Sequence, residues 1–257
     1  LDRPMARVDP ARVRLLSPTK LKLVPKPGGV VYWMSRDQRV RDNWALLHAR
    51  DLAVSSGVGL SVIFCLVPSF AQATIRQYGF MLRGISECER DLRSVGVPFK
   101  LLQGDPVATL PAFAREHGVC ALVTDFSPMR VGKQWKEGVA AALPDVPLYE
   151  VDAHNVVPVW VASDKQEVGA RTIRKKINDR LPKWLVDIPP FEPLSPPGPR
   201  PQPNPALQSA REDEDEARED AGGAPSQTQL QKDVHELQAA LDASPLDEAS
   251  AAEVLER

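Results

Sequence analysis

The sequence predicts an α/β fold with a five-stranded, parallel, doubly wound sheet of the Rossmann-like type, followed by a disordered, proline-rich and acidic tail with a short helix. Three observations favour this class. Apolar runs of strand length alternate with segments in which apolar residues recur every three or four positions. Gly or Pro turns separate them, which implies right-handed crossovers and a sheet covered on both faces. Near residue 188 the pattern stops and proline and acidic residues take over.

The first half of the predicted sheet consists of two strands, each followed by a helix. Val30–Met34 is a β-branched and aromatic run, and residues 43–55 after it carry apolar residues at helical spacing. Leu60–Leu66 is a second apolar run of strand length. The helix expected over 74–95 repeats its apolar positions through Ile75, Tyr78, Leu82, Ile85, Cys88, Leu92 and Val95.

The second half continues the alternation with shorter elements. Strands are expected at 99–102, 120–124 and 148–151, with helices at 107–117 and 133–143 between them. The functional residues of a parallel doubly wound sheet gather at the carboxyl ends of its strands, near the point where the strand order reverses.

The composition divides the chain into five segments. Nine of the nineteen residues from 187 to 205 are proline, and seven acidic residues lie between 212 and 220, which is typical of a linker without fixed structure. We expect a basic leader at 1–29, the α/β domain at 30–160 and a basic interdomain segment at 161–188. A disordered linker is expected at 189–226 and a region of short helices at 227–257.

The charge is unevenly distributed along the chain. Up to residue 191 there are 27 Lys and Arg against 19 Asp and Glu, whereas the remainder has 5 against 15. The net charge of −2 therefore hides a basic body and an acidic tail. Only the body is suited to a polyanionic partner.

Several protein classes are excluded. Three cysteines and 6% aromatic residues do not suit a disulfide scaffold or a Cys-rich zinc module, and no apolar run is long enough to span a bilayer. The four histidines are widely separated, so no metal site is expected. Gly57 and Gly59 form a lone GxG before a strand, and neither a P-loop nor a GxSxG motif is present. A hydrolase or a P-loop enzyme therefore has no visible chemistry in this sequence.

Polar and aromatic residues at the strand ends predict a small-molecule crevice. For each group a structural role remains an alternative to ligand contact: loop ion pairs for Arg36, a strand-ending turn for 126–130, and backbone hydrogen bonds for His154 and Asn155. Asp42 and Asn43 precede a helix and are expected to cap it, with ligand contact as the alternative. The candidate cofactor-binding residues are Met34, Ser35, Arg36, Asp125, Phe126, Ser127, Arg130, Asp152 and Asn155.

Four ordered motifs carry a family resemblance. They are the segments 32–47, 125–130, 150–158 and 167–174, and the leader residues 12–16 agree with them. Together they closely resemble class II cyclobutane pyrimidine dimer photolyases, the DNA-repair branch of the photolyase and cryptochrome superfamily. The resemblance covers only the N-terminal α/β antenna domain of that family.

The resemblance implies an antenna chromophore, a deazaflavin or a folate, in the α/β domain. It also implies a helical FAD-binding domain downstream, and residues 246–257 loosely resemble the first helix of that domain. The resemblance further implies UV-damaged DNA as the partner of the full-length, monomeric protein. Because the chain begins with Leu1 and ends before most of that domain, we expect a fragment that is not catalytic alone. The absence of an apolar leader argues against secretion. The expected compartment is nuclear or organellar (chloroplast or mitochondrial) in a eukaryote and cytoplasmic otherwise.

The segment 165–183 is strongly basic and predicts a helix with a cationic stripe. Phosphate contact is one interpretation, and packing against the FAD-binding domain is the other. Trp44 and Trp135 lie in helical patterns and are expected in the core. The candidate nucleic-acid contacts are Arg171, Arg174, Lys175 and Lys176.

Three functions therefore remain open. The first is the antenna domain of a photolyase, the second is a freestanding chromophore- or nucleotide-binding module on the same fold, and the third is an interaction protein that recruits partners through its tail. The resemblance favours the first.

Overall fold

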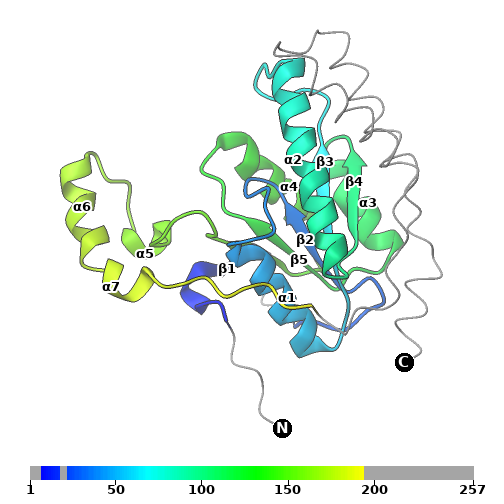
Figure 1. The fold of residues 1–257 in the computed structure, drawn as a ribbon, viewed down its shortest axis with the longest axis horizontal. Coiled ribbons are helices and arrows are strands. Elements are labelled where there is room, and N and C mark those ends of the chain that lie inside the picture. The colour runs from blue at the N-terminus through cyan, green and yellow to red at the C-terminus, as the bar shows by residue number, and fades with distance from the viewer. Residues whose placement is uncertain (1–6, 18–21, 194–257) are drawn as a thin grey trace, which may run out of the picture.

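A six-stranded sheet forms the centre of the molecule in the computed structural model, which describes residues 7–17 and 22–193 (Figure 1). The five predicted parallel strands are confirmed. Their order places β2 at the centre, with later strands added on both sides, so the strand order reverses between β2 and β5. These strands are β2 (Val30–Met34), β3 (Leu60–Leu66), β4 (Phe99–Gln103), β5 (Ala121–Asp125) and β6 (Leu148–Val151).

The expectation of five strands is corrected to six. The additional strand, β1 (Val13–Leu15), pairs antiparallel with β6, and Val13 lies opposite Val151. It comes from the region expected to be a basic leader. Its three residues are too few to show a period-two pattern, and the central one is Arg14, so no strand signal stood out.

Four helices cover the two faces of the sheet. α1 (Trp44–Ser56) and α2 (Ile75–Ser94) pack on the face that carries Tyr32, whereas α3 (Pro106–Glu116) and α4 (Arg130–Ala142) pack on the face that carries Trp33. The alternation of buried side chains along β2 therefore fills two cores at once.

The helices begin at the residues that the chemistry of their N-termini favours. Asn43 Oδ1 accepts hydrogen bonds from the backbone N–H groups of Ala45 and Leu46, both at 3.0 Å, so the predicted cap of α1 is confirmed. Asp105 caps α3 in the same way and is followed by Pro106 at the first helical position.

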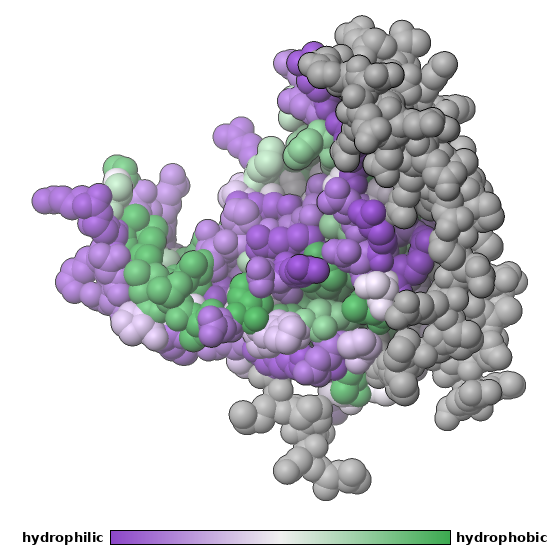
Figure 2. All heavy atoms as spheres, in the orientation of Figure 1, coloured by the Kyte–Doolittle hydropathy of each residue, from purple (hydrophilic) through white to green (hydrophobic). Residues whose placement is uncertain are grey.

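Beyond β6 the chain forms an arm that projects from the α/β body (Figure 1). It consists of α5 (Val159–Ala162), α6 (Ala170–Asn178) and α7 (Leu181–Trp184), which share a small apolar cluster with Val157. Figure 2 shows hydrophobic surface on the side of the arm toward the body and hydrophilic surface along its outer rim.

After the arm the chain returns to the body along α1 (Figure 1). Ile188 and Phe191 pack against the core that α1 shares with the sheet, and Arg50 of α1 donates to the main-chain oxygen of Glu192. The rest of the expected linker, from residue 194, and the helices expected in 227–257 lie outside the described residues.

Candidate functional site

A pocket of about 500 Å³ opens at the carboxyl ends of β2 and β3, where α2 and α4 flank the sheet. It lies next to the reversal of strand order between β2 and β5. This is the location at which open α/β sheets bind their ligands.

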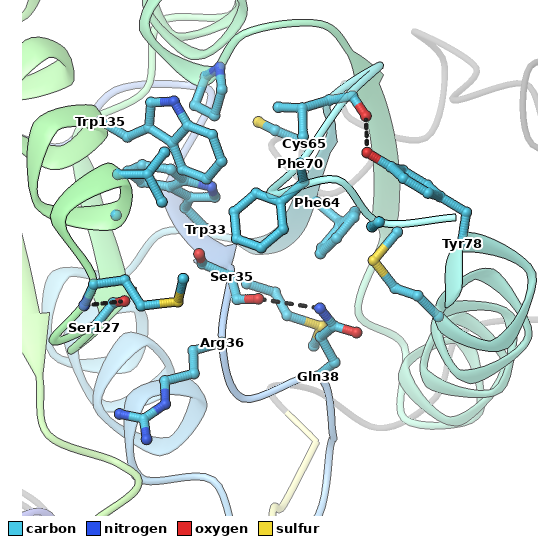
Figure 3. Close-up of a pocket in the computed structure, with 18 of the residues that line it drawn as sticks. Trp33, Ser35, Arg36, Gln38, Phe64, Cys65, Phe70, Tyr78, Ser127 and Trp135 are labelled. Atoms are coloured by element: carbon cyan, nitrogen blue, oxygen red, sulfur yellow. Dashed lines mark hydrogen bonds between the residues drawn. The ribbon is translucent and has the colours of Figure 1, made fainter. Parts of the chain in front are cut away.

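Aromatic side chains form much of the pocket wall. Trp33 lies on β2 and Phe64 on β3. Phe70 lines the pocket from the loop after β3, Tyr78 from α2 and Trp135 from α4 (Figure 3). The rings of Phe70 and Trp135 lie 5.9 Å apart between centroids and are tilted by 37°. Walls of this kind suit a flat, aromatic ligand.

The loop after β2 adds polar groups to the opposite side of the pocket. Ser35, Arg36 and Gln38 lie there, and Gln38 Nε2 donates to the main-chain oxygen of Ser35 at 3.2 Å (Figure 3). Among the described lining residues, Arg36 alone carries a charge. The half-buried guanidinium donates weakly to the main-chain oxygen of Phe126 at 3.5 Å, which leaves most of its donors available to an anionic group.

The loop after β3 reaches the pocket through unusual backbone conformations. Ala71 and Gln72 have φ angles of 47° and 60°, in the left-handed region that non-glycine residues seldom adopt. Tyr78 of α2 supports the loop by donating its hydroxyl to the main-chain oxygen of Val67 at 2.9 Å. The strained backbone presents Phe70 to Trp135.

Below the pocket, two carboxylates are buried side by side. Asp125 ends β5 and is 1% exposed, and Asp37 lies in the loop after β2 and is 4% exposed. Burial, together with the negative charge of Asp37, raises the pKa of Asp125 to about 6. Burial and the charge of Asp125 also raise the pKa of Tyr32, whose hydroxyl donates to Asp125 Oδ1 at 2.7 Å. Such a cluster is typical of a functional site.

The DNA photolyase family model matches residues 30–197, which is more than half of the chain. The chain belongs to the DNA photolyase family. It is 54% identical over 185 residues to a deoxyribodipyrimidine photo-lyase of Potorous tridactylus, covering 72% of this chain and 35% of that protein. It is 47% identical over 188 residues to the Arabidopsis thaliana deoxyribodipyrimidine photo-lyase, covering 72% of this chain and 38% of that protein. The chain thus spans little more than a third of the length of these relatives.

Solved structures support the same fold. The cryptochrome of Synechocystis sp. PCC6803 superposes with a TM-score of 0.54 at 17% identity, covering 72% of this chain and 42% of the cryptochrome. A photolyase of Sulfolobus tokodaii superposes with a TM-score of 0.52 at 14% identity, covering 64% of this chain and 37% of that photolyase. That archaeal photolyase is described with two FAD molecules, which imply a novel light-harvesting cofactor.

In this photolyase-family chain, the predicted site residues divide into three groups. Met34, Ser35, Arg36 and Ser127 line the pocket. Asp125 lies directly beneath it and holds the loop after β2. The lining does not include the other four, Phe126, Arg130, Asp152 and Asn155.

These four residues have other surroundings in the structure. Phe126 packs edge-on against Trp160 with centroids 5.7 Å apart, and Arg130 is exposed at the start of α4. Asp152 accepts hydrogen bonds from the main-chain and side-chain amides of Asn155, both at 3.0 Å, and from the Val159 N–H at 2.8 Å. Asp152 therefore organises the connection between β6 and α5.

Several residues of the photolyase pocket were not predicted. Trp44 is in the core as expected, but Trp135 is half-buried and lines the pocket together with Val131 and Gly132 of α4. Gln77, Tyr78 and Met81 line it from α2. Their spacing along each helix marks one face, but the periodicity alone does not show whether that face meets a core or a cavity.

The predicted nucleic-acid contacts all lie on α6, in the arm. Lys176 forms an ion pair with Glu167, and Lys175 Nζ lies 2.7 Å from Asp179 Oδ2. Arg171 and Arg174 are exposed. Lys175 is exposed as well, so of the four cations only Lys176 is partly buried.

Proposed function

We propose that this domain holds a light-absorbing antenna chromophore, a deazaflavin or a folate, in the pocket at the ends of β2 and β3. The observation that carries the proposal is the combination of five aromatic residues with one available cation in a pocket of about 500 Å³. A bound chromophore would supply light absorption and pass the energy to a flavin. The presence of two FAD molecules in the archaeal photolyase is consistent with a second pigment in this family.

The residues of the pocket fit such a group. Trp33, Phe70 and Trp135 offer ring faces and edges to a heteroaromatic system and exclude water from it. Arg36 is placed to pair with a carboxylate, phosphate or ionised ring oxygen. Ser35 and Gln38 have donors and acceptors for ring substituents.

Direct binding to the purified chain tests this proposal. Equilibrium dialysis with a 5-deazaflavin and with a methenyl folate is expected to show one site per chain for one of the two. Trp135→Ala and Arg36→Ala are each expected to weaken that binding about tenfold or more, since a lost ring contact or charged hydrogen bond costs about 1–3 kcal/mol. Trp160→Phe, outside the pocket lining, is the matched control and is expected to bind normally. If neither compound binds, the antenna function is wrong.

We further propose that the domain serves a class II photolyase that repairs cyclobutane pyrimidine dimers in UV-damaged DNA. The curated relatives are named deoxyribodipyrimidine photo-lyases, and this chain spans 35% of the length of the Potorous protein. Repair then requires an FAD-binding domain in addition to the residues described here, because the damaged bases must be flipped into a pocket beside the flavin. The purified chain is expected to leave thymine dimers intact under light. Measurable repair by this chain would contradict the requirement for an FAD-binding domain.

For the arm, we propose that Arg171 and Arg174 contact DNA phosphates in the complete enzyme. The supporting observation is their exposure on α6, whereas Lys175 and Lys176 already have acidic partners. Replacing both arginines by alanine is expected to reduce the slope of log affinity for duplex DNA against log salt by roughly two. An unchanged slope assigns the arm to contact with the FAD-binding domain instead.

A further inference from the structure

We propose that Asp125 is a positioning residue, which holds the loop after β2 in the one shape that presents Ser35, Arg36 and Gln38 to the pocket. This inference rests on the proposed antenna function and deepens it. It assigns a role to a residue that does not line the pocket.

The hydrogen bonds of the Asp125 carboxylate are the basis of the inference. Oδ2 accepts the backbone N–H groups of three consecutive residues, Ser35 at 2.9 Å, Arg36 at 3.0 Å and Asp37 at 3.2 Å. Oδ1 accepts the hydroxyl of Tyr32 at 2.7 Å. Consecutive N–H groups that converge on one anion form a concave nest, a backbone shape that an anion stabilises.

Sheet geometry explains why Asp125 occupies this place. β2 and β5 pair in parallel, and the last register pair is Trp33 with Thr124. Asp125 is the next residue of β5. Its carboxylate therefore takes the place of the main-chain carbonyl oxygens that would accept hydrogen bonds if β2 continued in the sheet. Without it, three N–H groups beneath the pocket lose their acceptor, and buried backbone donors are seldom left unpaired.

Other contacts fix the far side of the same loop. Asn43 Nδ2 donates to the main-chain oxygens of Asp37 at 3.3 Å and Arg39 at 2.9 Å, and His154 Nδ1 lies 2.9 Å from Asp37 Oδ1. These groups hold carbonyls and a side chain, whereas Asp125 holds the N–H groups of the pocket-lining residues themselves.

Burying the carboxylates of Asp125 and Asp37 next to each other costs free energy of folding. A turn with only a structural role would not need this pair. Asp125 and Asp37 are both nearly inaccessible to solvent, and Asp37 Oδ2 has no hydrogen-bond partner among the described residues. Two neighbouring buried carboxylates repel each other and lose hydration. A cost of this kind at a strand end beside a pocket is consistent with a site shaped for ligand binding.

Asp152 provides a matched control. It follows β6, is 0% exposed, and also accepts main-chain N–H groups, those of Asn155 and Val159. Those residues do not line the pocket. Asp125 and Asp152 are thus two buried carboxylates near the ends of adjacent strands, and only the first touches the pocket loop.

The test compares Asp125→Ala, Asp125→Asn and Asp152→Ala in the full chain. The ligand is whichever of the 5-deazaflavin and the methenyl folate the wild-type chain binds. Asp125→Ala is expected to raise Kd at least tenfold, and Asp125→Asn to stay within threefold because its amide oxygen still accepts the N–H groups. Asp152→Ala is expected to lower Tm while leaving Kd within twofold. An unchanged Kd in Asp125→Ala, or an equal rise in Asp152→Ala, overturns the inference.

Amide hydrogen exchange tests the positioning without any ligand. Exchange at Ser35, Arg36 and Asp37 is expected to accelerate at least tenfold in Asp125→Ala and to stay unchanged in Asp152→Ala. If Asp125→Ala does not fold, Asp125→Asn decides. Its neutral oxygen is a weaker acceptor, so amide exchange at the three residues is expected to accelerate three- to tenfold, and an unchanged exchange rate overturns the inference. If the wild type binds neither compound, the antenna function fails, while exchange still decides the role of Asp125.

Discussion

The guanidinium carbon of Arg12 lies 4.9 Å from the centroid of the Trp184 indole ring. It lies at the same distance from the ring of Trp44 in α1, so the cation contacts an aromatic ring of the arm and one of the body. Its Nη1 donates to the main-chain oxygens of Asp152 at 3.1 Å and Asn155 at 2.8 Å. Arg12, which is 2% exposed, therefore joins the start of the chain, the sheet and the arm.

Replacement of Arg12 by alanine is expected to lower the free energy of unfolding by about 3–5 kcal/mol, because main-chain oxygens lose their donors and two indole rings lose their cation. Arg12→Lys is expected to recover less than half of this loss, since an ammonium group cannot reproduce the planar fork of donors. Urea denaturation measures both values. Lys133→Ala, which breaks an exposed ion pair with Glu137, is the control and is expected to cost less than about 0.5 kcal/mol. A comparable loss in the control would contradict the role of Arg12.

The buried ion pair between Lys136 and Glu150 predicts an asymmetry between its two partners. The side chain of Lys136 is 6% exposed and that of Glu150 is 0% exposed, and Arg14 pairs with the same carboxylate from the half-exposed edge. Glu150→Gln leaves a buried ammonium group without an anion and is expected to cost about 3–5 kcal/mol. Lys136→Met keeps Arg14 as the partner of Glu150 and is expected to cost about half as much. Chemical denaturation of the two variants measures the order, and the reverse order would contradict this account.

Arg50 is expected to control protease access to the segment that follows the arm. Arg50 donates to both the main-chain oxygen and the carboxylate of Glu192. Arg50→Ala removes both contacts and is expected to accelerate cleavage within 187–193 about tenfold in limited proteolysis. Glu192→Ala keeps the main-chain acceptor of Arg50 but also loses an ion pair with Arg7, and a smaller acceleration is expected. Cleavage of Arg50→Ala at the wild-type rate would show that the contacts of Arg50 do not hold the segment.

Local sequence patterns predicted the sheet well because each parallel strand is a short apolar run with clear boundaries. The strands Val30–Met34, Leu60–Leu66 and Leu148–Val151 were predicted to the residue. β1 was missed because a three-residue edge strand is stabilised by its partner β6 and not by its own pattern. The leader residue Arg12 was likewise not predicted to be buried, since its partners lie about 140 residues away.

The pocket was predicted only where the strand-end rule applies. Ser35, Arg36 and Ser127 follow strands directly, so the topology alone places them at the site. Phe70 and Trp135 reach it through the left-handed backbone after Phe70 and through the rotation of α4. Both depend on tertiary packing that no short sequence window contains.

His48 and Asp125 titrate with opposite effects on stability. Burial lowers the pKa of His48 from 6.5 to about 4, so between these values the unfolded chain binds a proton that the folded chain does not, and acidification destabilises the fold. The pKa of Asp125 is instead raised from 3.8 to about 6, so the folded chain binds the extra proton and acidification stabilises it. At about 1.4 kcal/mol per pKa unit, each effect amounts to about 3 kcal/mol, and the two largely cancel between pH 4 and 6.

Variants that remove one group are expected to reveal the effect of the other. His48 Nε2 has no hydrogen-bond partner among the described residues, so His48→Leu removes the titration without breaking a bond at that atom. Relative to the wild type, its free energy of unfolding is expected to rise by about 2 kcal/mol when the pH falls from 6.5 to 4.5, whereas that of Asp125→Asn is expected to fall by about as much. Urea denaturation at the two pH values measures both changes. Because the comparison is with the wild type at each pH, titrating groups that do not interact with the replaced residue cancel, and two variants with wild-type pH dependence would show that neither group is shifted.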